Sequence, residues 1–246
     1  MKTILRILYV IFQLCISLPI ILVSTILTAI VTIIGGFLGN QDFWGYYPGM
    51  LWSRTICTSL LLPVHVKGKE LIDPDKAYII VANHQSAFDI FLIYGYLGKR
   101  FKWLMKKELA KIPLVGYACT KAGFIYIDRS SKVKSKESMD RAKQTLERGM
   151  SMVIFPEGTR SADGKTGRFK KGAFHLAEGL QLPVLPVTID GSFKVMPRRA
   201  KLITWHPMTL TIHPAIDAIS TEGLSESEIG EKINELTAKA EAAIKS

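Results

Sequence analysis

The sequence predicts an α/β fold, with a mixed, largely parallel sheet flanked by helices, preceded by an N-terminal hydrophobic helical membrane anchor. Short β-rich runs alternate with helical patterns, which is typical of a parallel sheet. Apolar residues form 48% of the 246 residues, enough for one moderate domain and an appendage. No charged residue lies between Arg6 and Asp42. We therefore expect membrane-anchoring helices over residues 1–64 and an α/β domain over residues 65–246.

The first element is the charge-free run, which contains ILYVIFQLCISLPIILVSTILTAIVTII. At a rise of ~1.5 Å per residue, this run is longer than one crossing of a ~30 Å hydrocarbon layer requires. Pro19 and the Gly35-Gly36 pair are positions where it could bend. A weaker apolar stretch follows from Met50 to Val64. The aromatic residues between and within these stretches favour the lipid headgroup level, and they are Trp44, Tyr46, Tyr47 and Trp52.

The flanking charges bear on the topology of this anchor. Lys2 and Arg6 precede the apolar run, and the chain is basic again after Lys67. Because basic flanks prefer the cytoplasmic face, both ends of the anchor are expected there. A bent pair of helices that enters the membrane and returns satisfies this preference, and one or two true crossings are the alternative. A cleaved signal peptide is disfavoured, because the run is too long and no clean A-x-A site follows it.

Net charge and cysteine content narrow the range of partners. A formal net charge of +11 indicates a polyanionic partner, which can be nucleic acid, an anionic membrane or a phosphorylated substrate. The membrane segment favours the bilayer, and we expect no nucleic-acid partner. Cys15, Cys57 and Cys119 lie far apart and are odd in number, which supports neither a disulfide framework nor a zinc site. A reducing compartment is expected.

Beyond residue 65 the elements follow in order. Strands are predicted at Tyr78–Ala82, Gly123–Ile127, Met152–Phe155 and Val184–Ile189. Helices are predicted at Lys134–Arg148 and Ala173–Gly179. The final segment opens with Ser225-x-x-Glu228 and continues with apolar residues at helical spacing, which predicts a capped amphipathic helix that covers the core.

The stretch NHQSAFD follows the first of these strands. A strand ending at Ala82 brings His84 to the carboxyl edge of the sheet, where α/β proteins bind their ligands. If a helix starts near Ser86, His84 can fold back so that Asp89 accepts a hydrogen bond from one ring nitrogen and leaves the other free as a base. The nucleophile is then either the Ser86 hydroxyl or, more economically, a hydroxyl of the substrate. We expect no metal, since the other histidines have no ligand-like spacing.

A second polar turn occurs in VIFPEGTRS. Gly158 allows close approach of the backbone to a ligand, while Thr159 and the planar guanidinium of Arg160 are donors suited to phosphate. Glu157 is out of place beside a bare anion. It is consistent with a residue that orients the arginine or accepts a hydroxyl of a polyol phosphate. The alternative is a tight turn with a surface arginine.

Four blocks between about Lys67 and Ser192, namely NHQSAFD, FIYIDR, VIFPEGTRS and LPVLPVTIDGS, resemble the glycerolipid acyltransferase family, most closely its bacterial 1-acyl-sn-glycerol-3-phosphate acyltransferases. The resemblance implies that His84 and Asp89 are the catalytic dyad. It implies that Arg129 and the turn from Glu157 through Arg160 bind the phosphate-bearing acceptor. Pro183 and Pro186 of the fourth block look structural or related to the acyl donor.

The resemblance also implies a reaction. His84 would take the proton of the sn-2 hydroxyl of 1-acyl-sn-glycerol 3-phosphate as this hydroxyl attacks the thioester of acyl-CoA or acyl carrier protein, giving phosphatidic acid. No cofactor and no acyl-enzyme are required. Backbone amides at the helix start, or Lys106 in preference to Lys107, are candidates to contact the substrate oxyanion, and a solvated basic face that holds anionic lipid is the alternative for these lysines. The substrate places the active site at the cytoplasmic face of the cell membrane.

Three other functions are weighed against this one. A relative that acylates another lyso-lipid, such as a lyso-ornithine lipid, fits the same blocks. A membrane serine lipase requires a nucleophile elbow, and no G-x-S-x-G occurs in the sequence. A non-catalytic basic membrane adaptor accounts for the charge and the anchor, but not for the two polar turns together.

Overall fold

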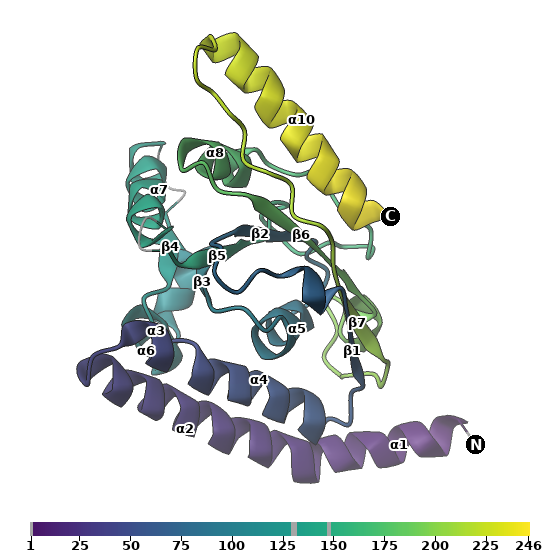
Figure 1. Cartoon of the computed structure of the whole chain (residues 1–246). Helices are drawn as coiled ribbons and strands as arrows, with labels where there is room; N and C mark the ends of the chain where they lie inside the picture. The colour runs from purple at the N-terminus through teal and green to yellow at the C-terminus, as the bar shows by residue number, and fades with distance from the viewer. Residues whose placement is uncertain (1, 129–131, 147–148) are drawn as a thin grey trace.

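The computed structural model describes residues 2–128, 132–146 and 149–246. The described part of the chain contains a seven-stranded sheet with the strand order β1-β7-β6-β2-β5-β3-β4 (Figure 1). Its neighbours are parallel except for the antiparallel pair β6–β7. The predicted fold class, a mixed and largely parallel sheet flanked by helices, is therefore confirmed. The strands are β1 (Val64–Lys67), β2 (Ile79–Ala82), β3 (Phe101–Lys106), β4 (Ile125–Ile127), β5 (Ser151–Ile154), β6 (Val184–Asp190) and β7 (Met208–Ile212).

Helices cover both faces of the sheet, which explains why the central strands β2 and β5 are buried at every position. On one face, α5 (Phe88–Tyr96) and α4 (Tyr47–Ser59) share an apolar core with the sheet. On the other face lie α7 (Lys132–Leu146), α8 (Gly172–Gly179) and α10 (Glu226–Lys245) (Figure 1). The remaining short helices are α6 (Val115–Lys121), α9 (Ser192–Val195), and the 3-10 turns Lys69–Leu71 and Lys107–Lys111.

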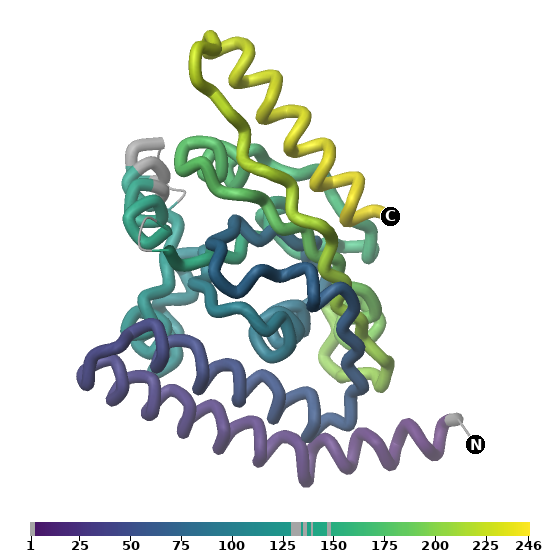
Figure 2. Tube along the Cα trace, viewed as in Figure 1, coloured from purple at the N-terminus to yellow at the C-terminus, as the bar shows by residue number. Residues whose placement is uncertain are grey.

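The N-terminal segment forms one long helix, after which the chain reverses and returns along α4. α1 (Lys2–Phe12), a π-helical turn (Gln13–Ser17) and α2 (Leu18–Phe37) are continuous. The wider π turn precedes Pro19, whose ring clashes with a regular preceding turn, so the helix passes the proline without reversing. The reversal comes after Phe37, where Asn40 adopts a positive φ of 48° and caps α3 (Gln41–Trp44). The trace then returns along α4, beside α2 (Figure 2).

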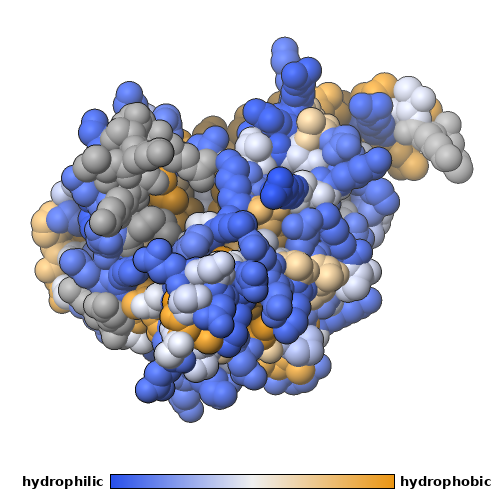
Figure 3. All heavy atoms as spheres, turned by 90° about the horizontal axis from the view of Figure 1, so that it is seen from above, coloured by the Kyte–Doolittle hydropathy of each residue, from blue (hydrophilic) through white to orange (hydrophobic). Residues whose placement is uncertain are grey.

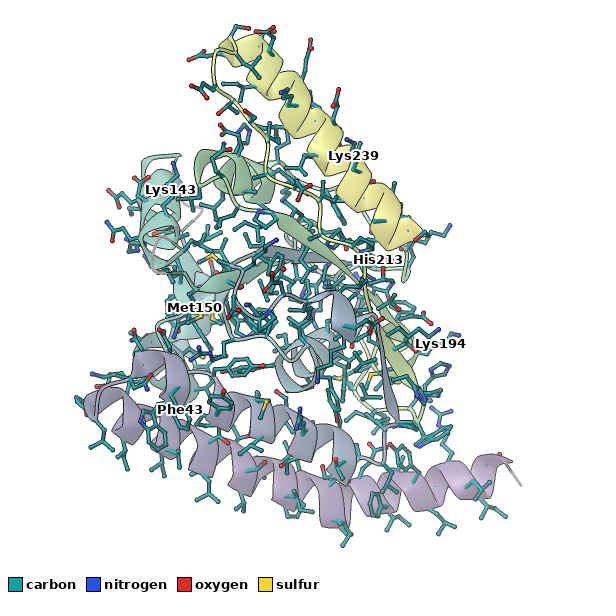
Figure 4. The ribbon with its side chains drawn as sticks, in the orientation of Figure 1. Phe43, Lys143, Met150, Lys194, His213 and Lys239 are labelled. Atoms are coloured by element: carbon teal, nitrogen blue, oxygen red, sulfur yellow. The ribbon has the colours of Figure 1, made fainter. Side chains whose placement is uncertain are left out.

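The long helix exposes an apolar surface. Among the described residues, Thr3–Phe37 is the one helix long and apolar enough to cross a membrane, and only 11% of its most apolar window is buried. Side chains of this helix project away from the sheet (Figure 4). Its exposed apolar residues include Leu8, Ile11, Leu22, Leu27 and Ile34. The face on the α10 side is mostly hydrophilic (Figure 3). This contrast is consistent with membrane association.

The second apolar stretch, expected from Met50 to Val64, belongs largely to the protein core. Ile56, Cys57 and Leu60 of this stretch are buried with Leu92 of α5. β1 begins at Val64, next to the predicted boundary between residues 1–64 and 65–246. The division into two domains stays a prediction, because α4 and the α/β unit share one core.

The elements α2, α3 and α4 form a helical hairpin, and polar contacts join its turn to the sheet. Lys102 of β3 is only 3% exposed, and its Nζ lies 3.0 Å from Asp42 Oδ1. The same ammonium donates to the carbonyl of Ala122 at 2.7 Å. Trp52 Nε1 donates to Thr25 Oγ1 at 2.9 Å, which links α4 to α2. The long helix is thus held flat along one side of the α/β unit.

Candidate active site

His84, in the loop after β2, contacts Asp89 in the first turn of α5. β2 ends at Ala82 and α5 begins at Phe88, two residues later than predicted, so Asp89 lies in the first helical turn. His84 Nδ1 is 2.8 Å from Asp89 Oδ2, which is the hydrogen bond expected from the sequence. Because a carboxylate oxygen accepts, Nδ1 carries the proton and Nε2 keeps its lone pair. The His84 side chain is 16% exposed, so the ring is largely buried.

The Asp89 carboxylate is fixed by its own loop. Oδ2 also accepts from the backbone N–H groups of Gln85 at 2.6 Å and Ser86 at 2.8 Å. The residue is fully buried, and its position at the start of α5 places negative charge at the positive end of the helix. The two amides at the helix start, considered above as oxyanion donors, are therefore already engaged with Asp89.

The Ser86 hydroxyl points away from the dyad. It is buried, and its Oγ donates to the carbonyl of Met196 at 2.8 Å. Oγ also accepts from the N–H of Phe88 at 3.2 Å. These contacts occupy the hydroxyl in a structural role and favour a substrate hydroxyl as the nucleophile.

Aromatic stacking sets the plane of the His84 ring. The ring centroid lies 3.9 Å from that of Phe155, with an interplanar angle of 10°. Phe155 in turn stacks on Trp103 at 5.8 Å and 26°. Stacking and the Asp89 hydrogen bond together leave the imidazole one orientation. The sequence predicted neither aromatic partner, because both contacts join different strands.

The backbone of His84 is held by the turn after β5. Glu157 Oε1 accepts from the His84 N–H at 2.7 Å, and the Ser161 N–H donates to the His84 carbonyl at 2.8 Å. The second Glu157 oxygen accepts from the Gly167 N–H at 2.8 Å. Glu157 is 8% exposed. Burial raises the pKa of its carboxyl, and the hydrogen bonds from His84 and Gly167 offset part of this effect.

Glu157 and Ser161 flank the remaining residues of this turn, so the turn lies beside the dyad. Gly158 has a φ of +76°, a conformation that favours glycine. Thr159 is exposed and Arg160 is half-buried. No hydrogen bond joins the Arg160 side chain to another residue in the described ranges, which leaves its guanidinium available to a ligand.

The other predicted residues follow neighbouring strands. The loop of His84 follows β2, the turn of Arg160 follows β5, and Lys106 is the last residue of β3. These three strands are adjacent and parallel. The loop, the turn and Lys106 therefore share the carboxyl edge of the sheet. Lys106 is exposed at the end of β3, and its neighbour Lys107 pairs with Asp128 at 2.8 Å. Arg129 lies outside the described residues.

Asn83 connects the fourth sequence block to the dyad. Its Nδ2 donates to the carbonyl of Ile189 at 2.9 Å, and its Oδ1 accepts from the N–H of the same residue at 2.8 Å. The buried side-chain amide thus continues the hydrogen bonding between β2 and β6 beyond the last backbone pair, Ala82 with Val187. Sequence reasoning assigned no role to Asn83, although its place directly before the histidine at a strand end was a signal.

Comparisons with known proteins agree with this geometry. A family model described as acyltransferase matches residues 63–190. A chloroplastic 1-acyl-sn-glycerol-3-phosphate acyltransferase of Arabidopsis thaliana is 32% identical over 194 residues, 77% of this chain and 54% of the relative. A 1-acyl-sn-glycerol-3-phosphate acyltransferase of Helicobacter pylori is 41% identical over 120 residues, 48% of this chain and 51% of the relative. The chain spans about half the length of these curated relatives.

A solved structure matches over the whole fold. The crystal structure of the 1-acyl-sn-glycerophosphate acyltransferase from Thermotoga maritima gives a TM-score of 0.75 at 28% sequence identity, covering 99% of this chain and 98% of that one. The family model itself covers more than half of the 246 residues and includes both polar turns. The chain belongs to the acyltransferase family.

Proposed function

We propose that this protein transfers an acyl group from a thioester donor to the sn-2 hydroxyl of 1-acyl-sn-glycerol 3-phosphate, giving phosphatidic acid. The observation that carries the proposal is the 2.8 Å contact of His84 Nδ1 with buried Asp89, which leaves Nε2 free as a base beside the turn of Arg160. The proteins to which this chain is similar carry the same activity in their names.

The reaction uses no nucleophile of the protein. His84 Nε2 takes the proton of the acceptor hydroxyl while the hydroxyl oxygen bonds to the thioester carbonyl carbon. The resulting imidazolium is stabilised by Asp89. The tetrahedral intermediate then collapses, the carbon–sulfur bond breaks, and the departing thiolate takes the proton back from Nε2. The exposed Lys106 is the donor we assign to the oxyanion, since the amides of Gln85 and Ser86 are engaged with Asp89.

Arg160 and Arg129 are assigned to the acceptor phosphate, with Gly158 and Thr159 shaping the turn. A guanidinium binds phosphate through two parallel hydrogen bonds, and two arginines together suit one dianionic phosphomonoester. The donor is acyl-CoA or acyl carrier protein. The protein acts at the cytoplasmic face of a membrane, with the apolar face of α1 and α2 on the lipid.

A direct assay tests the proposal. Purified protein in lipid vesicles is supplied with acyl-CoA or acyl carrier protein thioester and with either lysophosphatidate or lyso-ornithine lipid, and the products are separated. We expect phosphatidic acid from lysophosphatidate. Turnover of lyso-ornithine lipid alone would contradict the assigned acceptor but not the acyl transfer. No product with any acceptor would contradict the reaction class.

A further inference from the structure

A second exposed apolar surface lies beside the long helix and belongs to a different part of the chain. This surface, here called the Trp205 patch, consists of Leu61, Leu202 and Trp205, which are 58%, 46% and 51% exposed. Trp205 Nε1 donates to the carbonyl of Leu61 at 2.7 Å. The only polar group of the indole therefore faces the protein, and what remains exposed is hydrocarbon.

The end of α4 beneath this patch has all its carbonyls satisfied by the protein. The carbonyls of Ser59, Leu60 and Leu61 accept from side chains of Ser17, Tyr9 and Trp205, each at 2.7 Å. The three preceding carbonyls, of residues 56–58, accept from backbone N–H groups of residues 60–62. At a helix end in water, solvent supplies such donors. A helix end at the edge of a hydrocarbon layer requires protein donors instead, as found here.

Basic side chains accompany the patch. Arg198, Arg199 and Lys201 are exposed in the same loop, residues 196–207, and no carboxylate of the described residues pairs with any of them. Gln13 Nε2 donates to the carbonyl of Ile203 at 2.9 Å and fastens this loop to the long helix. The loop that carries the patch and these cations is thus joined directly to the long helix.

We propose that loop 196–207 is a second membrane contact, in which the Trp205 patch enters the headgroup region of an anionic phospholipid bilayer while Arg198, Arg199 and Lys201 bind lipid phosphates. Basic residues at an anionic surface and a Trp at headgroup level have this arrangement. The inference rests on the proposed function only in that both need a membrane. Because Ser86 Oγ donates to the carbonyl of Met196, the loop starts at the segment that joins His84 to Asp89.

An environment-sensitive fluorophore tests this contact without turnover. It is attached to Leu202→Cys in a Cys15→Ser, Cys119→Ser background, in vesicles with or without phosphatidylglycerol. The control is Lys239→Cys, which is exposed on α10, far from the long helix (Figure 4). In anionic vesicles we expect a blue-shifted emission at position 202 and protection from aqueous iodide, while position 239 remains quenched. Equal iodide quenching at both positions, in protein that floats with the vesicles, would overturn the proposal.

The charges are tested separately. The variant Arg198→Gln, Arg199→Gln, Lys201→Gln is expected to float with vesicles through α1 and α2, while protection of the label falls by about five-fold per charge removed. The control variant Lys170→Gln, Lys171→Gln, Lys239→Gln removes the same charge elsewhere and should keep the protection. Equal protection of the fluorophore from iodide in the two triple variants would overturn the proposal. Protection without vesicles, caused by self-association of the protein, would overturn it as well. Acyltransferase activity, measured on the same samples, reports on the proposed function independently.

Discussion

At the scale of single residues, Glu157 has contacts that differ from the role the sequence suggested. An acceptor ligand would present its oxygens to the site, yet both oxygens accept backbone N–H groups, from His84 and Gly167. The bond to Oε1 positions the His84 peptide unit, and the bond to Oε2 holds the carboxylate in place. The two roles affect different kinetic constants, because an acceptor ligand acts mainly on affinity and a residue that positions the base acts on turnover.

Glu157→Gln therefore should lower kcat by about 10-fold or more, since an amide nitrogen replaces one acceptor oxygen and a charge-assisted hydrogen bond is worth about 1.5–3 kcal/mol. The KM for lysophosphatidate should change little. The matched control is Glu235→Gln on α10, where the same chemical change occurs at an exposed position. Steady-state kinetics with both substrates distinguish the two roles, and a raised KM with normal kcat would support Glu157 as an acceptor ligand.

Arg160 leads to the opposite kinetic expectation. Its guanidinium has no described partner, and loss of one charge-assisted contact to phosphate corresponds to roughly 10- to 150-fold in affinity. Arg160→Ala should therefore raise the KM for lysophosphatidate. The effect should grow as pH rises through ~6, where the phosphomonoester gains its second negative charge. The KM for the acyl donor should hardly move, and the reverse pattern would assign this turn to the donor.

At the scale of elements, much of the sheet is readable from the sequence because its central strands are apolar throughout. The predictions for β2, β4, β5 and β6, and for α7, α8 and α10, agree with the structure to within a few residues. The strands β1, β3 and β7 were not predicted, and His65, Lys67 and Lys102 interrupt the apolar runs of the first two. Lys102 can be buried because Asp42, sixty positions earlier, pairs with it and the carbonyl of Ala122 accepts from it, and such distant partners cannot be read from a local pattern.

The contacts of the candidate site also differ in whether the sequence predicts them. The hydrogen bond of His84 to Asp89 was predictable, since a strand end followed by a helix start determines how two nearby residues meet. The contacts that fix the base in place were not. Phe155 and Asn83 act across strands, and their roles depend on a strand order that spacing in the sequence does not specify.

The Lys102 contact also predicts how the helical hairpin is held. Lys102→Met keeps much of the apolar stem but leaves Asp42 and the carbonyl of Ala122 without their buried donor, at a cost of about 1–3 kcal/mol. We expect faster proteolysis within residues 38–46 and a lower unfolding temperature. The comparison is Lys76→Met, which removes an exposed partner of Asp73 worth under about 1 kcal/mol. Equal proteolysis of the two variants would mean that the hairpin is held by apolar packing alone.

At the scale of the whole molecule, the packing of the long helix bears on its membrane topology. α2 lies along α4, and α4 lies along α5 of the α/β unit. A helix perpendicular to the bilayer would draw these partners into the hydrocarbon layer. The packing therefore favours a helix that lies in one leaflet, with its exposed apolar face on the lipid and the carboxyl edge of the sheet in water.

Labelling from the two sides of the membrane tests this arrangement. Leu38 is 72% exposed at the turn after α2. With Cys15 and Cys119 replaced by serine, Leu38→Cys should resist a membrane-impermeant maleimide applied to intact cells. Lys239→Cys in inverted vesicles should label, as the control for the cytoplasmic face. Strong labelling of position 38 from outside the cell would establish a true crossing.

The central claim is that His84, oriented by Asp89, acts as a base on a substrate hydroxyl without an acyl-enzyme. The most direct measurement is a single-turnover experiment with labelled acyl donor, using the wild-type protein, His84→Ala and Asp89→Asn in vesicles. The account predicts that His84→Ala forms essentially no phosphatidic acid while it still folds and binds vesicles. Asp89→Asn should be slower by roughly 10²–10⁴-fold, because the amide allows the wrong tautomer of His84. No label should remain on the protein. Near-normal turnover by His84→Ala, or an acyl group covalently trapped on the wild-type protein, would contradict the account.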